Sequence, residues 1–393
     1  MKKNEQNMIK NYLTIRYDPF EKISFNKALN SDFYSKFSDS DGKKTEKLLI
    51  KSLQKHAIQK NEPISLSLSS GIDSTLTLGL LRKVFPENDI FGICVVFEGG
   101  FDESIVAKSI AKKFDTKFKV IKVNSIFTNI SELITIAKKP RWNTYQHFVA
   151  NEAKKNSSIL INGDGADEIF AGYTFRYNKF LNNLNQRDTW LKKTKNYLNC
   201  HNRDWVPDQK DLFHKSMKFN WNHIFNYFKS YFSNSLNPLD QVMLADFNGK
   251  LMYDFIPTSS KISEYYGLKS FSIFLDPNLI KFGLHIPSSQ KYDPETQTGK
   301  LILRQITKRL GIEHINEKRG FSPDLLIDWQ RYGKKICDSK LLNLDSRIYT
   351  HEIINNDWLQ TAINKINDDG DIRYLNRVVS ILALEYYLEI FSQ

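Results

Sequence analysis

Six residues, Ser69-Ser-Gly-Ile-Asp-Ser74, combine small side chains, hydroxyl groups and one carboxylate in a way that suits phosphate binding. Successive backbone N–H groups in such a turn form a concave nest for an anion, and a following helix N-terminus adds partial positive charge. The hydroxyl groups of Ser69, Ser70 and Ser74 add donors. Asp73 would repel a phosphate unless a cation lies between them, which indicates Mg²⁺. A serine-rich helix cap is the alternative, and the loop is not a GxxxxGK[ST] sequence.

A second segment, residues 161–173 (INGDGADEIFAGY), gathers acidic residues after another expected strand. Three acids fall within five positions: Asp164, Asp167 and Glu168. The glycines on either side of Asp164 remove bulk and permit unusual backbone angles. Carboxylates at this place suit a metal ligand and a proton acceptor. A solvated acidic turn that caps a helix is the alternative.

Apolar periodicity predicts the elements that must position these two segments. We expect strands at Ile64–Leu68, Phe91–Phe97, Phe118–Val123 and Ser158–Asn162. We expect helices at Thr45–Gln59, Asp73–Val84, Ser104–Phe114, Ile126–Ala137 and Tyr145–Lys154. This order predicts an α/β fold, a parallel sheet with helices on both faces. Ligands bind at the carboxyl ends of such strands, where both segments fall.

The rest of the chain differs in composition from the α/β part and predicts other elements. Tyr12–Tyr17 (YLTIRY) alternates and predicts a short strand, and the aromatic-rich, asparagine-rich residues 174–240 lead into a mostly helical part. That part ends in an expected long helix over Asp371–Phe391. We therefore expect a short N-terminal extension over residues 1–42, an α/β core over 43–180 that carries both segments, and a mostly helical region over 181–393.

Composition excludes several classes of protein. The chain is 41% hydrophobic and 25% charged, as in soluble globular proteins, and not as in disordered ones. Its net charge of +12 is spread thinly, so a nucleic-acid partner is not expected from charge alone. Cys94, Cys200 and Cys337 are too far apart in sequence to suggest a zinc site or disulfide framework, which favours a reducing, cytoplasmic setting. No apolar stretch follows the basic N-terminus, so we expect no signal peptide. The longest apolar stretches are far shorter than the roughly 20 residues that a membrane-spanning helix needs.

Together the two segments resemble one known family. SSGIDS is similar to the pyrophosphate loop of N-type ATP pyrophosphatases, and NGDGADEIFAGY to a segment of the synthetase domain of asparagine synthetases. Further segments carry the same resemblance, which runs from about residue 45 to the C-terminus: FDES (101–104), FLD (274–276), GKLILR (299–304) and EKRGFSP (317–323).

The resemblance implies an adenine nucleotide alpha hydrolase-like fold, ATP and Mg²⁺, and an amide synthesis. A carboxylate attacks the α-phosphate of ATP to give an acyl-adenylate and pyrophosphate, and ammonia or an amine then displaces AMP. The implied ATP- and pyrophosphate-binding residues are Leu68, Ser69, Ser70, Gly71, Asp73, Ser74, Val96 and Gly163. The implied Mg²⁺ ligands are Asp73 and Asp167, and the implied catalytic residues are Asp164, Lys300 and Arg304. Asp164 stands where the family usually has Glu and would accept a proton, and Lys318 is a weaker candidate.

The chain also departs from the family. Lys2 stands where full-length members have the cysteine nucleophile of a glutaminase domain, so we do not expect this chain to hydrolyse glutamine. The nitrogen donor is then free ammonia, another amine, or ammonia from a separate glutaminase subunit. Phe271 replaces an arginine, Lys269 an acid and Ile273 a proline. Loss of that arginine removes a bidentate carboxylate partner and puts free aspartate in doubt as the acceptor.

Four functions remain open from the sequence. An asparagine synthetase-like ligase is favoured, and an amidotransferase or cyclase acting on a sugar acid or natural-product precursor is its sibling. A tRNA-modifying ATP pyrophosphatase would suit the positive charge, but such enzymes often use catalytic cysteines. A non-catalytic partner subunit is disfavoured by the retention of Asp73, Asp167 and Lys300. The sequence leaves a homo-oligomer open.

Overall fold

The computed structural model describes residues 1–393 except 144, 186, 202–205, 313–322 and 393. Its centre is a five-stranded parallel sheet in the order β3-β2-β1-β4-β5. The strands are β1 (Ile64–Ser67), β2 (Ile90–Phe97), β3 (Lys117–Val123), β4 (Ile159–Asn162) and β5 (Lys269–Ser272). The architecture that the sequence predicts is therefore confirmed.

The inner strands β1 and β4 are short and buried. Ile64 of β1 lies opposite Ile90 of β2 on one side and Ile159 of β4 on the other. All three side chains are essentially inaccessible, as expected where helices cover both faces of a parallel sheet. The four predicted strands agree with the observed ones to within one residue at each end.

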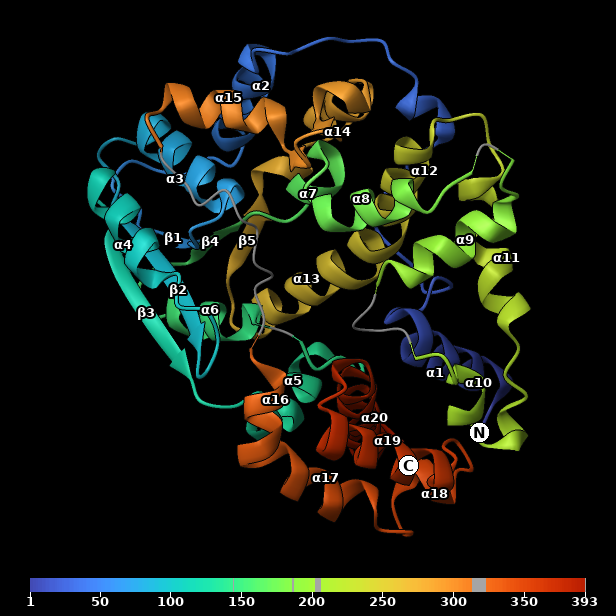
Figure 1. The fold of residues 1–393 in the computed structure, drawn as a ribbon. Coiled ribbons are helices and arrows are strands. Elements are labelled where there is room, and N and C mark those ends of the chain that lie inside the picture. Colours follow the sequence, from blue (N-terminus) through green and yellow to red (C-terminus); the bar gives the residue numbers. More distant parts are fainter. Residues whose placement is uncertain (144, 186, 202–205, 313–322, 393) are drawn as a thin grey trace.

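Helices cover the sheet on both faces, as Figure 1 shows. α3 (Ile72–Val84) packs on β1, and α4 (Ser104–Lys113) packs on β2 and β3. α6 (Gln146–Ala153) packs on β1, β2 and β4, and contacts α13 (Ile256–Tyr265), which packs on β5. The chain runs outward from β1 to β3 and then crosses to β4 on the other side of β1. The strand order therefore reverses between β1 and β4, and ligands of open parallel sheets bind at such a switch point.

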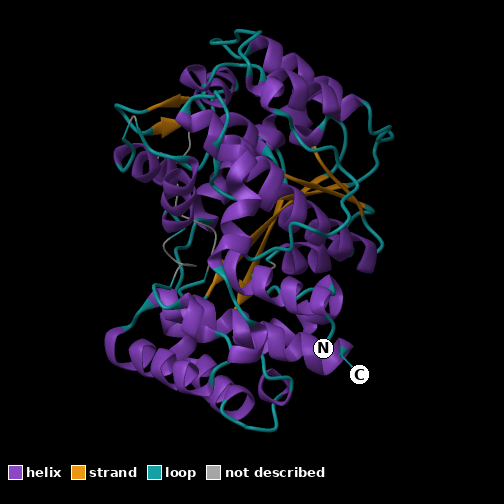
Figure 2. Cartoon of the chain, turned by 90° about the vertical axis from the view of Figure 1, so that its right-hand side faces the viewer, coloured by secondary structure: helices purple, strands orange, loops and turns teal. Residues whose placement is uncertain are grey.

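Helices dominate the rest of the chain (Figure 2). They are α1 (Lys3–Ile15), α2 (Lys43–Gln54), α5 (Ile130–Ala137), α7 (Ala166–Phe170), α8 (Thr174–Asn182), α9 (Trp190–Asn199), α10 (Gln209–Leu212), α11 (Trp221–Phe232), α12 (Pro238–Asp246), α14 (Pro277–Leu284), α15 (Leu301–Arg309), α16 (Leu325–Asp328), α17 (Lys334–Leu341), α18 (Arg347–Thr350), α19 (Asn356–Asp369) and α20 (Ile372–Phe391). β6 (Tyr292–Asp293) and β7 (Thr298–Gly299) form a small antiparallel pair. π-Helical turns occupy Phe247–Phe255 and Trp329–Gly333.

The strand predicted at Tyr12–Tyr17 is wrong, because this segment ends helix α1. Ile9, Tyr12 and Leu13 are buried at the i, i+3, i+4 spacing of one helix face. The helix packs against α20, where the Arg377 guanidinium donates to the carbonyl of Leu13. In both ribbon views the two termini lie on the same side of the molecule (Figures 1 and 2). The N-terminal residues thus complete the helical part instead of ending a sheet.

Two further differences lie near the edge of the sheet. The helix expected over Thr45–Gln59 ends at Gln54, and the residues beyond it turn toward β5. The strand β5 was not predicted, because four residues of sequence KSFS with a single partner strand carry no apolar run. This strand holds Phe271, the position where the family has arginine.

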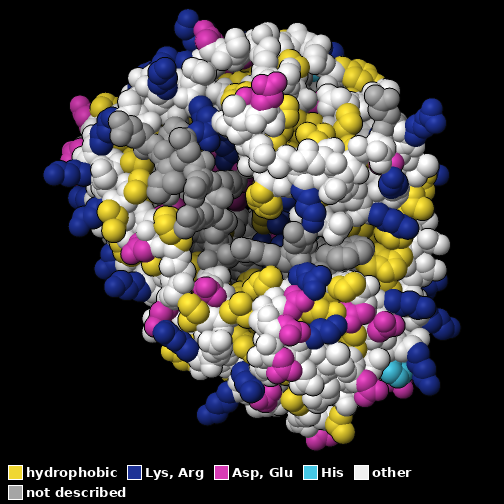
Figure 3. All heavy atoms as spheres, viewed as in Figure 1, with side chains coloured by type: hydrophobic (Ala, Val, Ile, Leu, Met, Phe, Trp, Pro, Cys, Tyr) yellow, Lys and Arg dark blue, Asp and Glu magenta, His cyan; other side chains and the backbone are white. Residues whose placement is uncertain are grey.

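The surface and the cysteines agree with the composition. On the face seen in Figure 3, Lys and Arg side chains are interspersed with Asp and Glu and form no single basic block. Cys94, Cys200 and Cys337 are free and buried. Among the residues that the structure describes, no helix combines the length and apolar character needed to cross a membrane.

Candidate active site

The loop after β1 folds as a compact turn onto the N-terminus of α3. The N–H of Ser69 donates to Ser74 Oγ at 3.0 Å, and the Ser69 and Ser74 hydroxyls lie 2.9 Å apart. The N–H of Gly71 donates to Ser69 Oγ at 3.1 Å. Gly71 is the N-cap residue of α3. The hydroxyl groups expected to bind phosphate thus stabilise the turn.

An oxyanion already lies on the donors of this loop. The N–H of Ser70 and its hydroxyl donate to the same oxygen of Glu103, at 2.9 and 2.7 Å. Glu103 directly precedes α4, so the carboxylate comes from the neighbouring strand-to-helix loop. The loop is therefore competent to bind an oxyanion, and a phosphate that used these two donors would have to displace Glu103.

The second segment brings Asp167 to the first. After β4 the chain turns through Gly165, whose φ of +92° is a left-handed conformation that favours glycine. Helix α7 then begins and carries Asp167. A side chain at Gly163 would press on the Cβ of Asp73, with a separation of 3.1 Å. These glycines allow the loops after β1 and β4 to approach each other closely.

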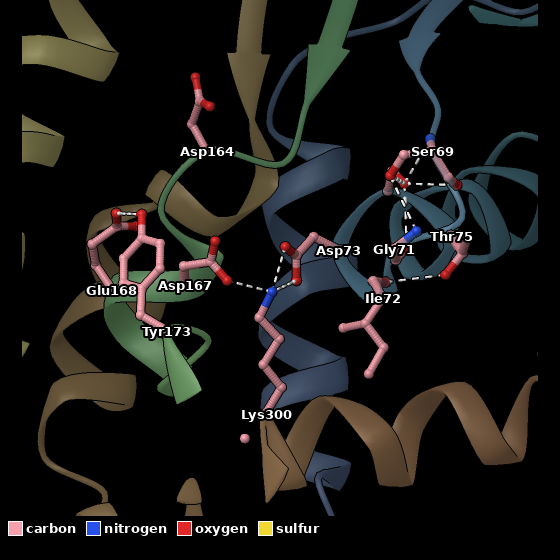
Figure 4. Close-up of polar contacts among 12 residues, drawn as sticks. Ser69, Gly71, Ile72, Asp73, Thr75, Asp164, Asp167, Glu168, Tyr173 and Lys300 are labelled. Carbon is pink, nitrogen blue, oxygen red and sulfur yellow. Dashed lines mark hydrogen bonds and ion pairs between the residues drawn. The ribbon is translucent and has the colours of Figure 1, made fainter. Parts of the chain in front are cut away.

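Lys300 lies between the two segments (Figure 4). Its Nζ lies 2.7 and 2.6 Å from the two carboxylate oxygens of Asp73 and 2.5 Å from Oδ1 of Asp167. Burial acts to lower the pKa of Lys300, but the carboxylates of Asp167 and Asp73 outweigh burial and raise that pKa above its ordinary value. The ammonium group is therefore held charged, between carboxylates in the first turns of α3 and α7.

Asp164 points away from this ion pair (Figure 4) and is hydrogen-bonded to residues of α13 and β5. Ser259 Oγ donates to Asp164 Oδ2 at 2.9 Å, and Ser272 Oγ donates to the Asp164 carbonyl at 2.6 Å. Burial raises the pKa of Asp164, and the hydrogen bond from Ser259 offsets only part of that shift. A carboxylate with a raised pKa accepts a proton more readily than a solvated one.

Glu168 is a buried carboxyl group beside this centre. Its Oε1 accepts a hydrogen bond from the Tyr173 hydroxyl at 2.6 Å. Burial, together with the charge of Asp167, raises the pKa of Glu168 to about 7. The sequence marked this residue only as one acid of the cluster, because burial cannot be seen in the motif itself.

The remaining predicted residues lie around the same edge. Leu68 is buried at the end of β1, and Val96 lies one residue before the end of β2. Arg304 lies one turn after Lys300, where its Nε donates to the carbonyl of Gly299 at 2.9 Å. Its role in catalysis stays a prediction. Lys318 lies outside the described residues.

A cavity of about 610 Å³ adjoins Asp164 and was not predicted. It is lined along β5 and α13, and the ring of Phe271 lies in it, stacked on His56 with centroids 3.4 Å apart and planes 11° apart. The sequence signal was the replacement of arginine by phenylalanine at this position. His56 carried no signal, because nothing local joins it to β5.

Comparison with known proteins identifies the family of the chain. A sequence model described as asparagine synthase matches residues 44–389. The chain belongs to the asparagine synthase family. It is 25% identical over 299 residues to "Asparagine synthetase [glutamine-hydrolyzing] 1" of Bacillus subtilis, which covers 67% of this chain and 47% of that protein. It is 26% identical over 172 residues to "Putative asparagine synthetase [glutamine-hydrolyzing] 2" of Methanocaldococcus jannaschii, which covers 42% of this chain and 32% of that protein. The chain thus aligns with less than half of the length of each of these relatives.

Among solved structures, the chain is similar to an NH3-dependent NAD synthetase from Campylobacter jejuni, at 16% identity and a TM-score of 0.25, with 50% of this chain and 99% of that chain covered. It is also similar to a U34-tRNA thiolase NcsA from Methanococcus maripaludis, at 16% identity and a TM-score of 0.25, with 71% and 83% covered. The chain's own sheet order, and not these likenesses, defines its fold.

The two carboxylates around Lys300 fit a Mg²⁺ ion. Asp73 and Asp167 are oxygen donors turned toward one positive charge, and hard cations such as Mg²⁺ favour carboxylate oxygens. Among the described residues, no group of three or more His, Cys, Asp or Glu side chains is arranged to hold a metal ion. Mg²⁺ at this place would therefore take its other ligands from water and phosphate oxygens, as is usual for this ion.

Proposed function

We propose that this chain is an ATP-dependent, AMP- and pyrophosphate-forming amide synthetase. The observation that carries the proposal is the Lys300 ammonium, held by Asp73 of the first segment and Asp167 of the second. The two segments meet at the switch point of the sheet, where nucleotides bind in open parallel folds. Membership of the asparagine synthase family supports the same class of reaction.

The proposed first step activates a carboxylate. A carboxylate oxygen forms a bond to the α-phosphorus of ATP while the bond from that phosphorus to pyrophosphate breaks. The Ser69–Ser74 loop would hold the departing pyrophosphate through its N–H and hydroxyl donors. Asp73 and Asp167 would hold Mg²⁺, which supplies positive charge to phosphate oxygens when bound. Lys300 would neutralise the negative charge that develops on the phosphates.

The proposed second step forms the amide. A nitrogen nucleophile forms a bond to the acyl carbon while the bond from that carbon to AMP breaks, and AMP leaves with the electron pair. The nucleophile must lose a proton as it attacks. Asp164 would accept this proton, because burial raises its pKa and its carboxylate lies apart from the charged Lys300.

The experiment that tests this function measures pyrophosphate and AMP released from ATP·Mg²⁺, with aspartate and ammonia supplied and asparagine assayed alongside. The Asp73→Asn variant and a matched charge change at the exposed Asp357→Asn are measured beside the wild type. We expect pyrophosphate and AMP in equal amounts from the wild type and Asp357→Asn, and at least a hundredfold less from Asp73→Asn. Release of ADP and phosphate, or full activity of Asp73→Asn, would contradict the proposal.

Aspartate is the first acceptor to test. Because residues 269–273 depart from the family pattern, other carboxylates are tested next. If aspartate gives no turnover while ATP binds and Asp73→Asn weakens that binding, the same assay is run with sugar acids and other amino acids. Asparagine formed in equal amount to AMP would make the chain an asparagine synthetase in activity.

A further inference from the structure

The cavity beside Asp164 is far larger than ammonia requires. Its volume is about 610 Å³, within the usual range for a site that binds a small organic molecule. A water molecule, which is close to ammonia in size, occupies about 30 Å³ in the liquid. The cavity therefore has room for a molecule with a substantial organic part.

The cavity follows the edge of the sheet and ends at Asp164. Its walls come from β5, from the loop after α2 and from the serine-rich face of α13. Ser259 lines the cavity and donates to Asp164 Oδ2 at 2.9 Å. Asp164 lines the cavity and precedes Asp167 by three residues, so the cavity adjoins the segment that carries the Lys300 centre. A molecule in the cavity would thus reach the proposed proton acceptor from the side away from Lys300.

The charged groups of the lining favour a positively charged or basic occupant. Three carboxylates line the cavity, those of Asp164, Glu264 and Asp276. The Lys55 ammonium is paired with Asp276. Burial lowers the pKa of His56, so this imidazole is neutral at physiological pH. Glu264 is likewise paired with Lys261. Asp164, which accepts a hydrogen bond from Ser259 Oγ, is therefore the lining carboxylate that would attract a basic nitrogen.

The same lining offers an apolar and aromatic surface. The Phe271 ring lies stacked on His56 within the cavity, and apolar side chains of Phe25, Ile256 and Leu275 also line it. Serines of α13 and of β5 also line the cavity and supply hydrogen-bonding groups: Ser259, Ser260, Ser263, Ser270 and Ser272. An occupant with one basic nitrogen and an apolar or aromatic part matches both surfaces.

We propose that this cavity binds the nitrogen donor of the reaction, and that the donor is an organic primary amine with an apolar or aromatic part. The proposal rests on the proposed function and names its second substrate class. The neutral amine nitrogen forms a bond to the acyl carbon, the bond from that carbon to AMP breaks, AMP leaves with the electron pair, and one proton passes from nitrogen to Asp164. The product is a substituted amide.

The test is direct binding of probe amines, which needs no knowledge of the carboxylate substrate. 2-Phenylethylamine and cadaverine are titrated into the full chain by calorimetry, and 2-phenylethanol serves as the probe that lacks the amine. Ser260→Trp fills the cavity from an exposed position of α13. Tyr265→Trp, which places the same side chain on the exposed face of that helix outside the cavity, is the matched control.

We expect at least one of the two amines to bind the wild type and Tyr265→Trp with the same Kd, and to bind Ser260→Trp at least tenfold more weakly. In the wild type, this amine should bind more tightly than 2-phenylethanol. ATP binding should be the same in all three proteins. Ser270→Trp fills the cavity from β5 and should repeat the loss if Ser260→Trp does not fold. If neither amine binds, or if an amine binds Ser260→Trp as tightly as the wild type, this inference is wrong. The proposed function would still stand as long as the wild type binds ATP. Loss of ATP binding by the wild type would instead overturn the proposed function.

Discussion

The Nζ of Lys300 lies 2.7 and 2.6 Å from the two carboxylate oxygens of Asp73, although 227 residues separate them in the sequence. The same nitrogen lies 2.5 Å from Asp167. The Lys300 ammonium thus joins the N-terminal turns of α3 and α7 to the start of α15. Without that positive charge the two carboxylates would repel each other unless one of them took up a proton.

Lys300→Ala should therefore weaken the fold as well as the reaction. Removing the ammonium leaves two facing carboxylates in a largely buried place, and we expect a loss of about 2–4 kcal/mol in the free energy of unfolding. Added Mg²⁺ should recover part of this loss by bridging the carboxylates, so Mg²⁺ should raise the Tm of Lys300→Ala more than that of the wild type. Thermal unfolding with and without Mg²⁺ measures both effects.

The matched control is Lys308→Ala, which removes an exposed lysine from the same helix. Its Tm and its response to Mg²⁺ should equal those of the wild type. Equal responses of Lys300→Ala and Lys308→Ala to Mg²⁺ would contradict the proposal that Asp73 and Asp167 hold Mg²⁺.

Glu103→Gln should tighten ATP binding. The Glu103 carboxylate accepts hydrogen bonds from both the N–H and the hydroxyl of Ser70, and it adds a negative charge where phosphates are expected. The amide removes that charge and is easier to displace, so we expect the Kd for ATP·Mg²⁺ to fall about three- to tenfold. Calorimetric titration measures this change. Asp102→Asn makes the same charge change one residue earlier, at a side chain turned to Ser104, and an equal gain in that variant would refute a specific effect of Glu103.

Gly172→Ala should abolish activity through crowding alone. An added Cβ at Gly172 would collide with the carboxylate of Asp167 and the side chain of Lys300. Both must shift, and we expect pyrophosphate release to fall at least a hundredfold. Gly79→Ala is the comparison, because its Cβ would meet only the ends of flexible side chains, and it should keep most of the activity. A fully active Gly172→Ala would show that Asp167 and Lys300 need not lie together.

The sequence predicted the parts of this fold that repeat a regular pattern. β2 and β4 are apolar runs, and β1 alternates apolar and polar residues, so period and length identified these strands. Tyr12–Tyr17 was misread because the residues before it were left out of the pattern; Ile9, Tyr12 and Leu13 together show the helical spacing. β5 was missed because a short edge strand is defined by its partner, β4, and not by its own residues.

The candidate site follows the same division. Asp73, Asp167 and Lys300 were predicted from motifs, and the structure brings them together. The contact of Glu103 with Ser70 and that of Ser259 with Asp164 were not predicted, because they join residues 33 and 95 positions apart in the sequence. The domain limits at residues 42 and 180 and the functional roles of all the candidate site residues stay predictions.

A buried lysine away from the site should give stability a distinct pH dependence. The Nζ of Lys291 is buried without a hydrogen-bond partner in the described residues, and burial lowers the pKa of Lys291 to about 7, while Asp240 opposes that shift. The unfolded chain holds this proton up to pH about 10.5. Between pH 7 and 10.5 the unfolded state therefore binds more protons, so this group makes the free energy of unfolding rise with pH over that range and adds no further change below about pH 7.

Lys291→Met should remove this slope and raise the free energy of unfolding by about 3 kcal/mol at pH 6, with a smaller gain at pH 9. Urea unfolding at the two pH values measures the difference. The exposed Lys281→Met on α14 should change neither value. An unchanged slope in Lys291→Met would mean that this lysine keeps its proton in the folded state.

The most direct test of the account follows an oxygen atom. Carboxylates labelled with ¹⁸O, beginning with aspartate and then amino acids and sugar acids as a set, are incubated with the chain, ATP, Mg²⁺ and 2-phenylethylamine or ammonia. Attack of the carboxylate on the α-phosphorus predicts that AMP carries one ¹⁸O atom and that an amide forms in equal amount. AMP without label, or ADP and phosphate in its place, would contradict carboxylate adenylation.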